Sequence, residues 1–207
     1  MFKINPRVEG SNHALRQLYQ EIDTSVIGHF TDFGHVRNVH YMGNQTPRIV
    51  GNAITVRIPH CDGSILREAL ILSQPDDILV IDTSGDYQRA CWGELRTLAA
   101  MIKNLAGVII DGAVTDIDSI KTLGFPVFAR TISPLTTRSL KLEGEINSVI
   151  SVGGVCVQAG DLVIADSNGV FILEPTRANE LAAIFIEKKE QDRIRFNELL
   201  SKYKMMR

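Results

Sequence analysis

The sequence predicts an α/β domain built on a mixed sheet. Between residues 52 and 129, short apolar runs typical of buried strands alternate with segments of helical periodicity. From residue 151 to 174 the pattern changes to three short β-rich runs separated by glycine-containing turns. From Thr176 onward the chain is highly charged and has a helical pattern. Parallel strands joined by helices, with a β-rich addition and a terminal helix, account for all three observations.

The first two thirds of the chain are expected to contain helices and strands in a regular order. Short helices are expected at residues 11–20 and 24–30, a strand at 52–58, a helix at 62–73 capped by Asp62, and a strand at 77–82. These are followed by a helix at 93–104, a strand at 106–110, a short helix at 116–123 and a strand at 125–129. The apolar run at 77–82 is typical of a strand that is buried on both faces.

The last third is expected to form a β-meander followed by a long helix. Its β-rich runs are separated at Gly153-Gly154, Ala159-Gly160-Asp161 and Ser167-Asn168-Gly169. Asn168 and Gly169 both tolerate positive φ, which favours a hairpin there. The helix is expected at 176–205, packed on a neighbour or projecting from the body. Because no linker divides the chain, one domain is expected over residues 1–207, with its core at about 50–174.

The composition is that of a globular protein and excludes several classes. Of the 207 residues, 44% are hydrophobic and 22% are charged, and the formal net charge is −2. The basic excess of a nucleic-acid-binding protein is absent. No apolar run approaches the roughly 18 residues of a membrane helix, and the N-terminus lacks the apolar segment of a signal peptide. Neither nucleic acid nor a membrane is therefore an expected partner. Cys61, Cys91 and Cys156 lack the spacing of zinc ligands or disulfides, so a reduced cytoplasmic setting is expected.

Two strand-end loops contain the predicted site. A helix is expected to begin at Gly93. The backbone amides of Glu94, Leu95 and Arg96 therefore lack intrahelical partners and can bind a carboxylate or phosphate. Asp116 follows the next strand, and ligands of open α/β sheets gather at the carboxyl ends of strands. The alternative is that Asp116 only caps the helix that it precedes.

Four sequence runs carry a resemblance to a known family. GELRTLAA, LAGVIIDGAVTDID, LGFPVFAR and SVGGVCVQAGDLVIADSNGV follow one another within residues 50–170. In this order they resemble the family of the regulator of ribonuclease activity A (RraA), which includes metal-dependent 4-hydroxy-4-methyl-2-oxoglutarate / 4-carboxy-4-hydroxy-2-oxoadipate aldolases. The resemblance implies a swivelling-type β/β/α domain and a trimer or hexamer with sites between subunits. It also implies class II aldolase or oxaloacetate decarboxylase chemistry with Mg²⁺ or Mn²⁺.

The catalytic members of that family carry an acidic residue, then after a spacer the pair Arg-Asp, and a further acid a few positions on. Glu94 occupies the first acidic position, and the pair begins 21 residues later as Thr115-Asp116. Asp116 matches the metal-binding aspartate. Thr115 stands where the family has an arginine that holds the keto oxygen and the enolate of the substrate. The further acid is expected at Ser119, and Asp118 lies one residue before it.

The absence of this arginine affects how the site could stabilise the negative charge of the reaction. Cleavage of an α-keto acid produces a pyruvate enolate, whose oxyanion needs positive charge. The hydroxyl of Thr115 is a weaker donor than a guanidinium, so slow turnover, a different substrate or no catalysis is expected. Arg96 or Arg130 could compensate. In the aldolases a C-terminal glutamate of a neighbouring subunit joins the site, and Glu187 or Glu190 could take that part.

The leading hypothesis is a lyase that uses Mg²⁺ or Mn²⁺ to cleave or decarboxylate a small α-keto acid, such as 4-hydroxy-4-methyl-2-oxoglutarate or oxaloacetate. In it Glu94 and Asp116 are catalytic, Asp116 holds the metal and Glu94 holds metal-bound waters. The substrate contacts Gly93, Thr115 and the three amides that follow Gly93. The alternatives are a non-catalytic protein that binds and regulates a protein partner, as the ribonuclease E regulator does, and a divergent lyase acting on a sugar acid. Because that regulator lacks the metal aspartate, Asp116 favours an enzyme.

Overall fold

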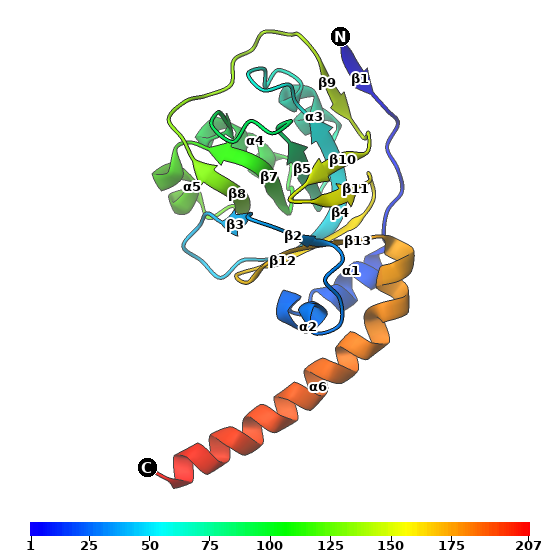
Figure 1. The fold of residues 1–207 in the computed structure, drawn as a ribbon, viewed down its shortest axis with the longest axis vertical. Helices are drawn as coiled ribbons and strands as arrows, with labels where there is room; N and C mark the ends of the chain where they lie inside the picture. The colour runs from blue at the N-terminus through cyan, green and yellow to red at the C-terminus, as the bar shows by residue number, and fades with distance from the viewer.

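The computed structural model describes residues 1–207 as a mixed sheet with helices packed on it (Figure 1). Along the main path of the sheet lie β2 (His35–Val36), β13 (Gly169–Leu173), β12 (Leu162–Asp166), β4 (Arg48–Arg57), β5 (Asp77–Asp82), β7 (Gly107–Val114), β8 (Val127–Ile132) and β3 (His40–Tyr41), in that order. β4, β5, β7 and β8 run parallel to one another, whereas β2, β3, β12 and β13 pair antiparallel with their neighbours. The predicted α/β class with a mixed sheet is confirmed.

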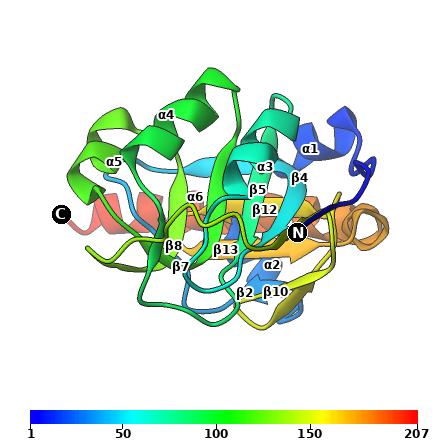
Figure 2. The same ribbon diagram turned by 90° about the horizontal axis from the view of Figure 1, so that it is seen from above.

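The remaining strands and the helices complete three packed cores. Off the main path lie β1 (Phe2–Ile4), β6 (Ala90–Trp92) and β9 (Gly144–Ile146), and β10 (Ile150–Val152) pairs separately with β11 (Val155–Val157). The helices are α1 (His13–Tyr19), α2 (Thr24–Gly28), α3 (Leu66–Leu72), α4 (Glu94–Ile102), α5 (Ile117–Leu123) and α6 (Pro175–Met205). α3, α4 and α5 lie over one face of the parallel strands (Figure 2), where one core forms. A second core fills the opposite face beside β10 and β11, and a third lies under α1, α2 and α6.

β7 is longer than the sequence predicted, and its extension leads to the candidate site. The predicted strand spanned residues 106–110, but β7 continues through Asp111 and Gly112 to Val114. The expected end was wrong because tertiary pairing overrides the low strand propensity of Asp and Gly. β6 supplies that pairing, since it lies parallel to β7 at Ala113 and Val114.

Asp62 does not cap the helix that was predicted to begin there. α3 begins at Leu66. The fully buried carboxylate of Asp62 instead accepts hydrogen bonds from the amides of Ser64 (2.9 Å), Leu140 (3.1 Å) and Leu142 (2.7 Å). The cap prediction failed because a distant segment of the chain competes for this carboxylate. Asp62 thereby ties the start of α3 to the segment that leads into β9.

Two hairpins replace the predicted meander, because β10 and β11 pair apart from the main sheet. Gly153 and Gly154 have φ of +55° and +83° and form the first turn, as two positive-φ residues of a tight hairpin do. The second hairpin lies where the sequence predicted it, but Asn168 does not adopt the positive φ that was expected in its turn. Asp166 pairs with Gly169 across this turn, and the carboxylate of Asp166 accepts a hydrogen bond from the Asn168 amide at 2.8 Å.

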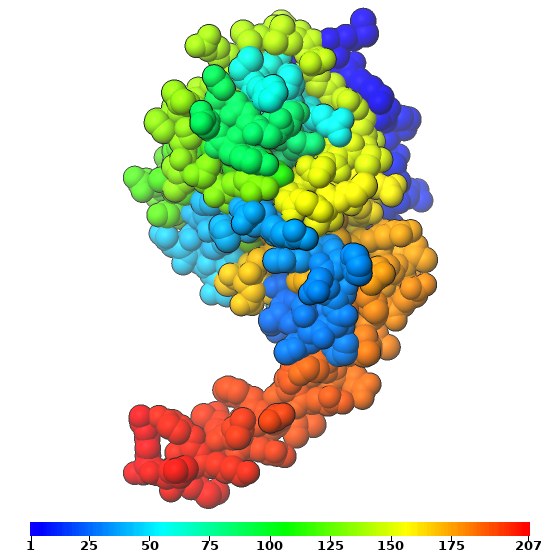
Figure 3. All heavy atoms as spheres, viewed as in Figure 1, coloured from blue at the N-terminus to red at the C-terminus, as the bar shows by residue number.

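α6 packs on the body through its first turns and then projects from it, as Figures 1 and 3 show. Ala178, Ala182 and Phe185 are buried in the third core. Beyond them, side chains such as Phe196 and Tyr203 are exposed. Of the two placements expected for this helix, the single chain adopts the projecting one. No helix of the structure combines the length and the apolar character needed to cross a membrane.

Candidate active site

The candidate active site lies where β6 and β7 end side by side. The parallel pairing of Trp92 with Val114 brings the residues that follow them, Gly93 and Thr115, next to each other. The Thr115 amide donates to the Trp92 carbonyl at 2.9 Å and locks this arrangement. α4 starts after one strand and α5 after the other, so the structure brings the two predicted loops together.

Asp116 has a left-handed backbone and points its carboxylate at the start of α4. Its φ of 53° and ψ of 42° lie in a region that few residues other than glycine adopt and that Asp tolerates well. Its Oδ2 accepts a hydrogen bond from the Glu94 amide at 3.0 Å, and its Oδ1 accepts one from the Thr115 hydroxyl at 3.3 Å. Its side chain makes no capping hydrogen bond to α5. Capping of α5 therefore does not account for Asp116.

Gly93 is needed because the carboxylate of Asp116 approaches its backbone closely. Gly93 has an extended conformation that any residue can adopt, with φ of −157°. A Cβ atom at this position would collide with Oδ2 of Asp116 and lie 2.9 Å from Cγ2 of Thr115. The sequence suggested Gly93 as a helix start and as a substrate contact, and no local signal showed this close approach.

Glu94 is the second carboxylate of the site. Its Oε2 accepts a hydrogen bond from the hydroxyl of Ser119 at 2.7 Å. The position where the resemblance implied an acid thus carries a hydroxyl that orients Glu94, while Asp118 is exposed in the first turn of α5. Glu94 and Asp116 are exposed as well, and each keeps carboxylate lone pairs that no protein donor uses. The result is an open cluster with two negative charges.

Two of the three backbone amides that were predicted to bind the substrate remain available. The Glu94 amide serves Asp116 and not a ligand in this structure. The first hydrogen bond of α4 is made by the amide of Thr97, so the amides of Leu95 and Arg96 precede the helical ladder. Because a side chain of the protein occupies the first amide, two of the three predicted amides are free in this structure.

Neither arginine that was considered as a substitute for the missing guanidinium is free. Arg96 donates to the carbonyl oxygens of Cys91 and Gly63, the latter at 3.2 Å. Burial of this guanidinium lowers the pKa of Arg96. Arg130 forms an ion pair with the buried Asp111. Compensation by either residue is therefore absent from this structure.

Glu187 and Glu190 also do not reach the site within one chain. Both lie on α6, which leaves the body away from α4 and α5 (Figure 1). Glu187 accepts a hydrogen bond from Gln191 at 3.0 Å, and Glu190 forms an ion pair with Arg193. Their contacts are thus with neighbours on the same helix.

Cys91 and Trp92 are structural. Burial raises the pKa of Cys91 to about 12, so its thiol is a poor nucleophile at neutral pH. Trp92 is buried, and its Nε1 donates to the hydroxyl of Thr97 at 2.9 Å. Both side chains belong to the core beneath α4.

The donor set fits a hard divalent cation held mainly through water. No group of three or more His, Cys, Asp or Glu side chains in the structure could hold a metal ion. Glu94 and Asp116 nevertheless supply free carboxylate oxygens at the adjoining ends of β6 and β7. Mg²⁺ typically keeps several waters and uses one or two carboxylates, which matches this pair better than a closed cage of side chains would.

An apolar stripe on α4 begins beside the site. Leu95, Leu98 and Ile102 recur at the spacing of one helix face and are 75%, 41% and 80% exposed. A helix on a monomeric protein normally presents polar side chains outward. This stripe is therefore an exposed apolar surface next to Glu94.

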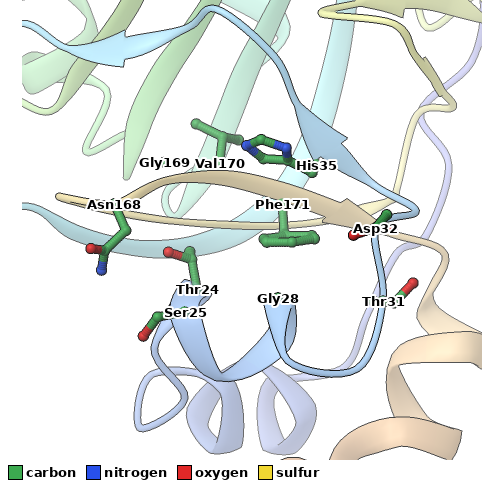
Figure 4. Close-up of a pocket in the computed structure, with 10 residues that line it drawn as sticks. All are labelled: Thr24, Ser25, Gly28, Thr31, Asp32, His35, Asn168, Gly169, Val170 and Phe171. Carbon is green, nitrogen blue, oxygen red and sulfur yellow. The ribbon is translucent and has the colours of Figure 1, made fainter.

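A hollow of about 280 Å³ lies elsewhere, between α2 and β13 (Figure 4). The rings of His35 and Phe171 lie 5.5 Å apart in its lining. Asp32 is its one carboxylate. It lacks the paired acids and the free helix-start amides of the α4–α5 cluster, so it is not the candidate active site.

Comparison with known proteins decides the family. Residues 22–172 match the family described as RraA-like, Aldolase/RraA. The chain belongs to the RraA-like family. It is 36% identical to an uncharacterized protein of Methanocaldococcus jannaschii over 146 residues, which are 70% of each chain. It is 34% identical over 149 residues to a Halalkalibacterium halodurans protein named "Putative 4-hydroxy-4-methyl-2-oxoglutarate aldolase", covering 72% of this chain and 70% of that one.

Solved structures agree on the RraA-like fold. The crystal structure of Streptomyces coelicolor RraAS2 is described as that of an unusual member of the RNase ES inhibitor RraA protein family. It superposes with a TM-score of 0.79 over 91% of this chain and 99% of that chain, at 19% sequence identity. At that identity the likeness establishes the fold alone.

Proposed function

We propose that this RraA-like protein is a divalent-metal-dependent lyase that cleaves or decarboxylates a small α-keto acid. Substrates of this class include 4-hydroxy-4-methyl-2-oxoglutarate and oxaloacetate. Loss of the bond beyond C3 of either compound leaves the enolate of pyruvate. The second product is a keto acid in the first case and carbon dioxide in the second.

The observation that carries the proposal is the convergence of Glu94 and Asp116 from two separate strand ends. Asp116 adopts an uncommon backbone conformation, and Gly93 leaves room for its carboxylate. Capping of α5 does not account for Asp116, and neither carboxylate has a cationic partner within the chain.

The chain's own residues divide the work in this proposal. Asp116 would hold Mg²⁺ or Mn²⁺, and Glu94 would hold waters bound to it. When bound, the cation supplies Lewis-acid polarisation of the keto oxygen. The amides of Leu95 and Arg96 bind the substrate carboxylate at the start of α4. Ser119 keeps Glu94 in place through its hydroxyl.

Thr115 favours a second candidate, a non-catalytic binding protein. Its hydroxyl already donates to Asp116, and it supplies no charge to an enolate. A site that lacks this charge can still bind an acid without turning it over. The retained pair of carboxylates makes the lyase the better-supported function.

The test is release of pyruvate from a panel of keto acids, including oxaloacetate, with and without added Mg²⁺ or Mn²⁺. We expect metal-dependent release by the parent protein and loss of it in Asp116→Asn. Asp118→Asn is the matched control, because Asp118 is an exposed acid on α5 outside the hydrogen-bonded cluster. Absence of pyruvate from every keto acid, with metal present, would contradict the lyase and favour the binding protein.

We also propose that the site is shared between subunits of a trimer or hexamer. The exposed apolar stripe of α4 supports this assembly, because closed symmetry would cover it next to Glu94. Light scattering should give a stable oligomer that Ile102→Glu disrupts. Ile71→Glu, on the exposed face of α3, is the control. A stable monomer of 22.9 kDa at micromolar concentration would contradict this assembly.

A further inference from the structure

A basic hollow lies on the side of α4 away from α5. It has a volume of about 360 Å³ and opens between α3, the first turn of α4 and the segment before β9. Three cationic side chains line it, those of Arg67, Arg96 and Lys141. The one acidic side chain in its lining is that of Glu68. Neither Glu94 nor Asp116 belongs to this lining.

Arg96 is a largely buried cation that has no acidic partner in the chain. Its guanidinium donates only to two neutral carbonyl oxygens, and it forms no ion pair. The contrast is with Arg7, which forms two hydrogen bonds of 2.7 Å with the buried Asp77. A desolvated charge is costly unless it is paired, so Arg96 lacks the counter-charge that such a residue requires.

The walls of the hollow are fixed in place by hydrogen bonds. The Gly63 amide donates to the carbonyl of Arg138 at 3.0 Å, and the Lys141 amide donates to the hydroxyl of Ser64 at 3.0 Å. Both contacts join the start of α3 to the segment before β9, as buried Asp62 also does. The basic groups therefore stand on a preorganised frame.

Gly63 permits the guanidinium to approach this frame. A Cβ atom at Gly63 would lie 3.1 Å from Nη2 of Arg96 and 2.6 Å from the hydroxyl oxygen of Thr137. A larger residue would displace the hydroxyl of Thr137 and force the guanidinium to shift. Neither Arg67 nor Lys141 forms an ion pair, so their charges also remain available to a ligand.

We propose that this hollow binds a phosphate group, either free or carried by a small phosphorylated molecule. The three cations outnumber the one acid by two charges, which matches a phosphate dianion. A guanidinium donates to two phosphate oxygens at once, and Arg96 uses only part of its donor capacity on carbonyls. The volume falls within the range of small-ligand pockets, about 300–1,000 Å³, and exceeds what a bare phosphate fills. Phe2 supplies an apolar wall for the organic part of a monoester.

The proposal stands apart from the lyase function, because binding is measured without turnover. Calorimetric titrations with inorganic phosphate and with glycerol 3-phosphate, at constant ionic strength set with chloride, give the affinity of each. We expect saturable binding of one ligand per chain. Tighter binding of the ester identifies a phosphorylated molecule as the source, and equal binding identifies free phosphate.

Variants assign the binding to this hollow. Arg67→Gln and Lys141→Gln change exposed side chains without hydrogen bonds to the frame, so both proteins should fold. Each should weaken binding about tenfold or more, as loss of a charge-assisted contact does. Arg138→Gln is the control, because Arg138 is an exposed cation on the same segment whose side chain does not line the hollow. Absence of saturable binding at millimolar ligand, or equal affinities in all the variants, would overturn the proposal. Loss of the oligomer in Arg67→Gln and Lys141→Gln would also overturn the proposal. In that case the basic side chains of the hollow would pair with a carboxylate of a second copy, and not with phosphate.

Discussion

Asp111 on β7 and Asp116, which follows the end of this strand, lie in opposite surroundings. Asp111 is buried, pairs with Arg130 and accepts the Gly153 amide at 2.7 Å, so both of its oxygens are used inside the protein. Asp116 is exposed, and its contacts are one amide and one hydroxyl. The Asp111 group therefore joins β7 to β8 and to the β10–β11 turn. The Asp116 group keeps capacity for a ligand.

This difference separates structural from functional polar groups within one chain. Buried polar groups are stable only when their hydrogen-bonding capacity is satisfied, so a saturated cluster contributes to folding. An exposed carboxylate with free lone pairs contributes little to folding. Substitutions should therefore affect stability at Asp111 and ligand binding at Asp116.

The largest expected effect is on stability, at Asp111. Asp111→Ala leaves the partly buried Arg130 without its partner, and breaking a buried ion pair in this way typically costs about 3–5 kcal/mol. Urea unfolding monitored by circular dichroism measures this change. Asp116→Asn is the comparison, and a shift within about 0.5 kcal/mol is expected there because the residue is exposed and asparagine tolerates the left-handed backbone as aspartate does. Equal destabilisation by the two substitutions would show that the two clusters do not differ in this way.

The next effect is on metal binding, at Asp116. Asp116→Asn keeps the side chain's shape but removes the negative charge that a hard cation needs. Substitution of residues that merely support metal ligands costs about 10- to 100-fold in affinity, so loss of the ligand itself should cost at least about 100-fold. Calorimetry with Mn²⁺ measures it, with Asp118→Asn as the control. Unchanged Mn²⁺ affinity in Asp116→Asn would contradict the assignment of Asp116 as a metal ligand.

The buried carboxylate of Asp62 resembles that of Asp111, because hydrogen bonds within the protein use its oxygens. Its contribution to stability is expected to depend on pH. Burial alone would raise the pKa of Asp62, but hydrogen bonds from Ser64, Leu142 and Leu140 outweigh it and lower the pKa to about 2. The folded pKa lies below the ordinary value of 3.8, so the stabilisation is present above that pH and is lost as pH falls toward 2. Asp62→Asn should cost about 1–3 kcal/mol near neutral pH. Unfolding curves between pH 2 and pH 7 should converge for parent and variant at the acid end; a constant gap would contradict the assignment.

The same distinction explains which features the sequence could predict. Helix α4 and the buried strand β5 follow from local periodicity, and the Gly153-Gly154 turn follows from local backbone preference. Features that depend on distant partners were missed. β7 extends because β6 pairs with it, and Asp62 serves a segment nearly 80 residues away and does not cap α3. At the site, motif spacing selected Glu94 and Asp116, but only the structure shows that Asp116 occupies the Glu94 amide.

The smallest expected effect concerns Thr115, between the two classes. It is half-exposed, and its hydroxyl makes one long hydrogen bond of 3.3 Å to Asp116, so little stability depends on it. Thr115→Arg introduces a guanidinium beside the proposed enolate oxygen. Partial recovery of oxyanion stabilisation should raise the rate of oxaloacetate decarboxylation by about tenfold, which corresponds to about 1.4 kcal/mol. The hydroxyl of Ser119 limits the gain, because proton transfer that an acid at this position would assist stays unsupported. Thr115→Met is the control that distinguishes the effect of the positive charge from that of side-chain size, since it adds a long side chain without a cation. A rise in rate with arginine alone supports a lyase weakened at one position. An unchanged or lower rate in Thr115→Arg, with Mn²⁺ affinity preserved, would mean that Thr115 belongs to a pocket shaped for another ligand.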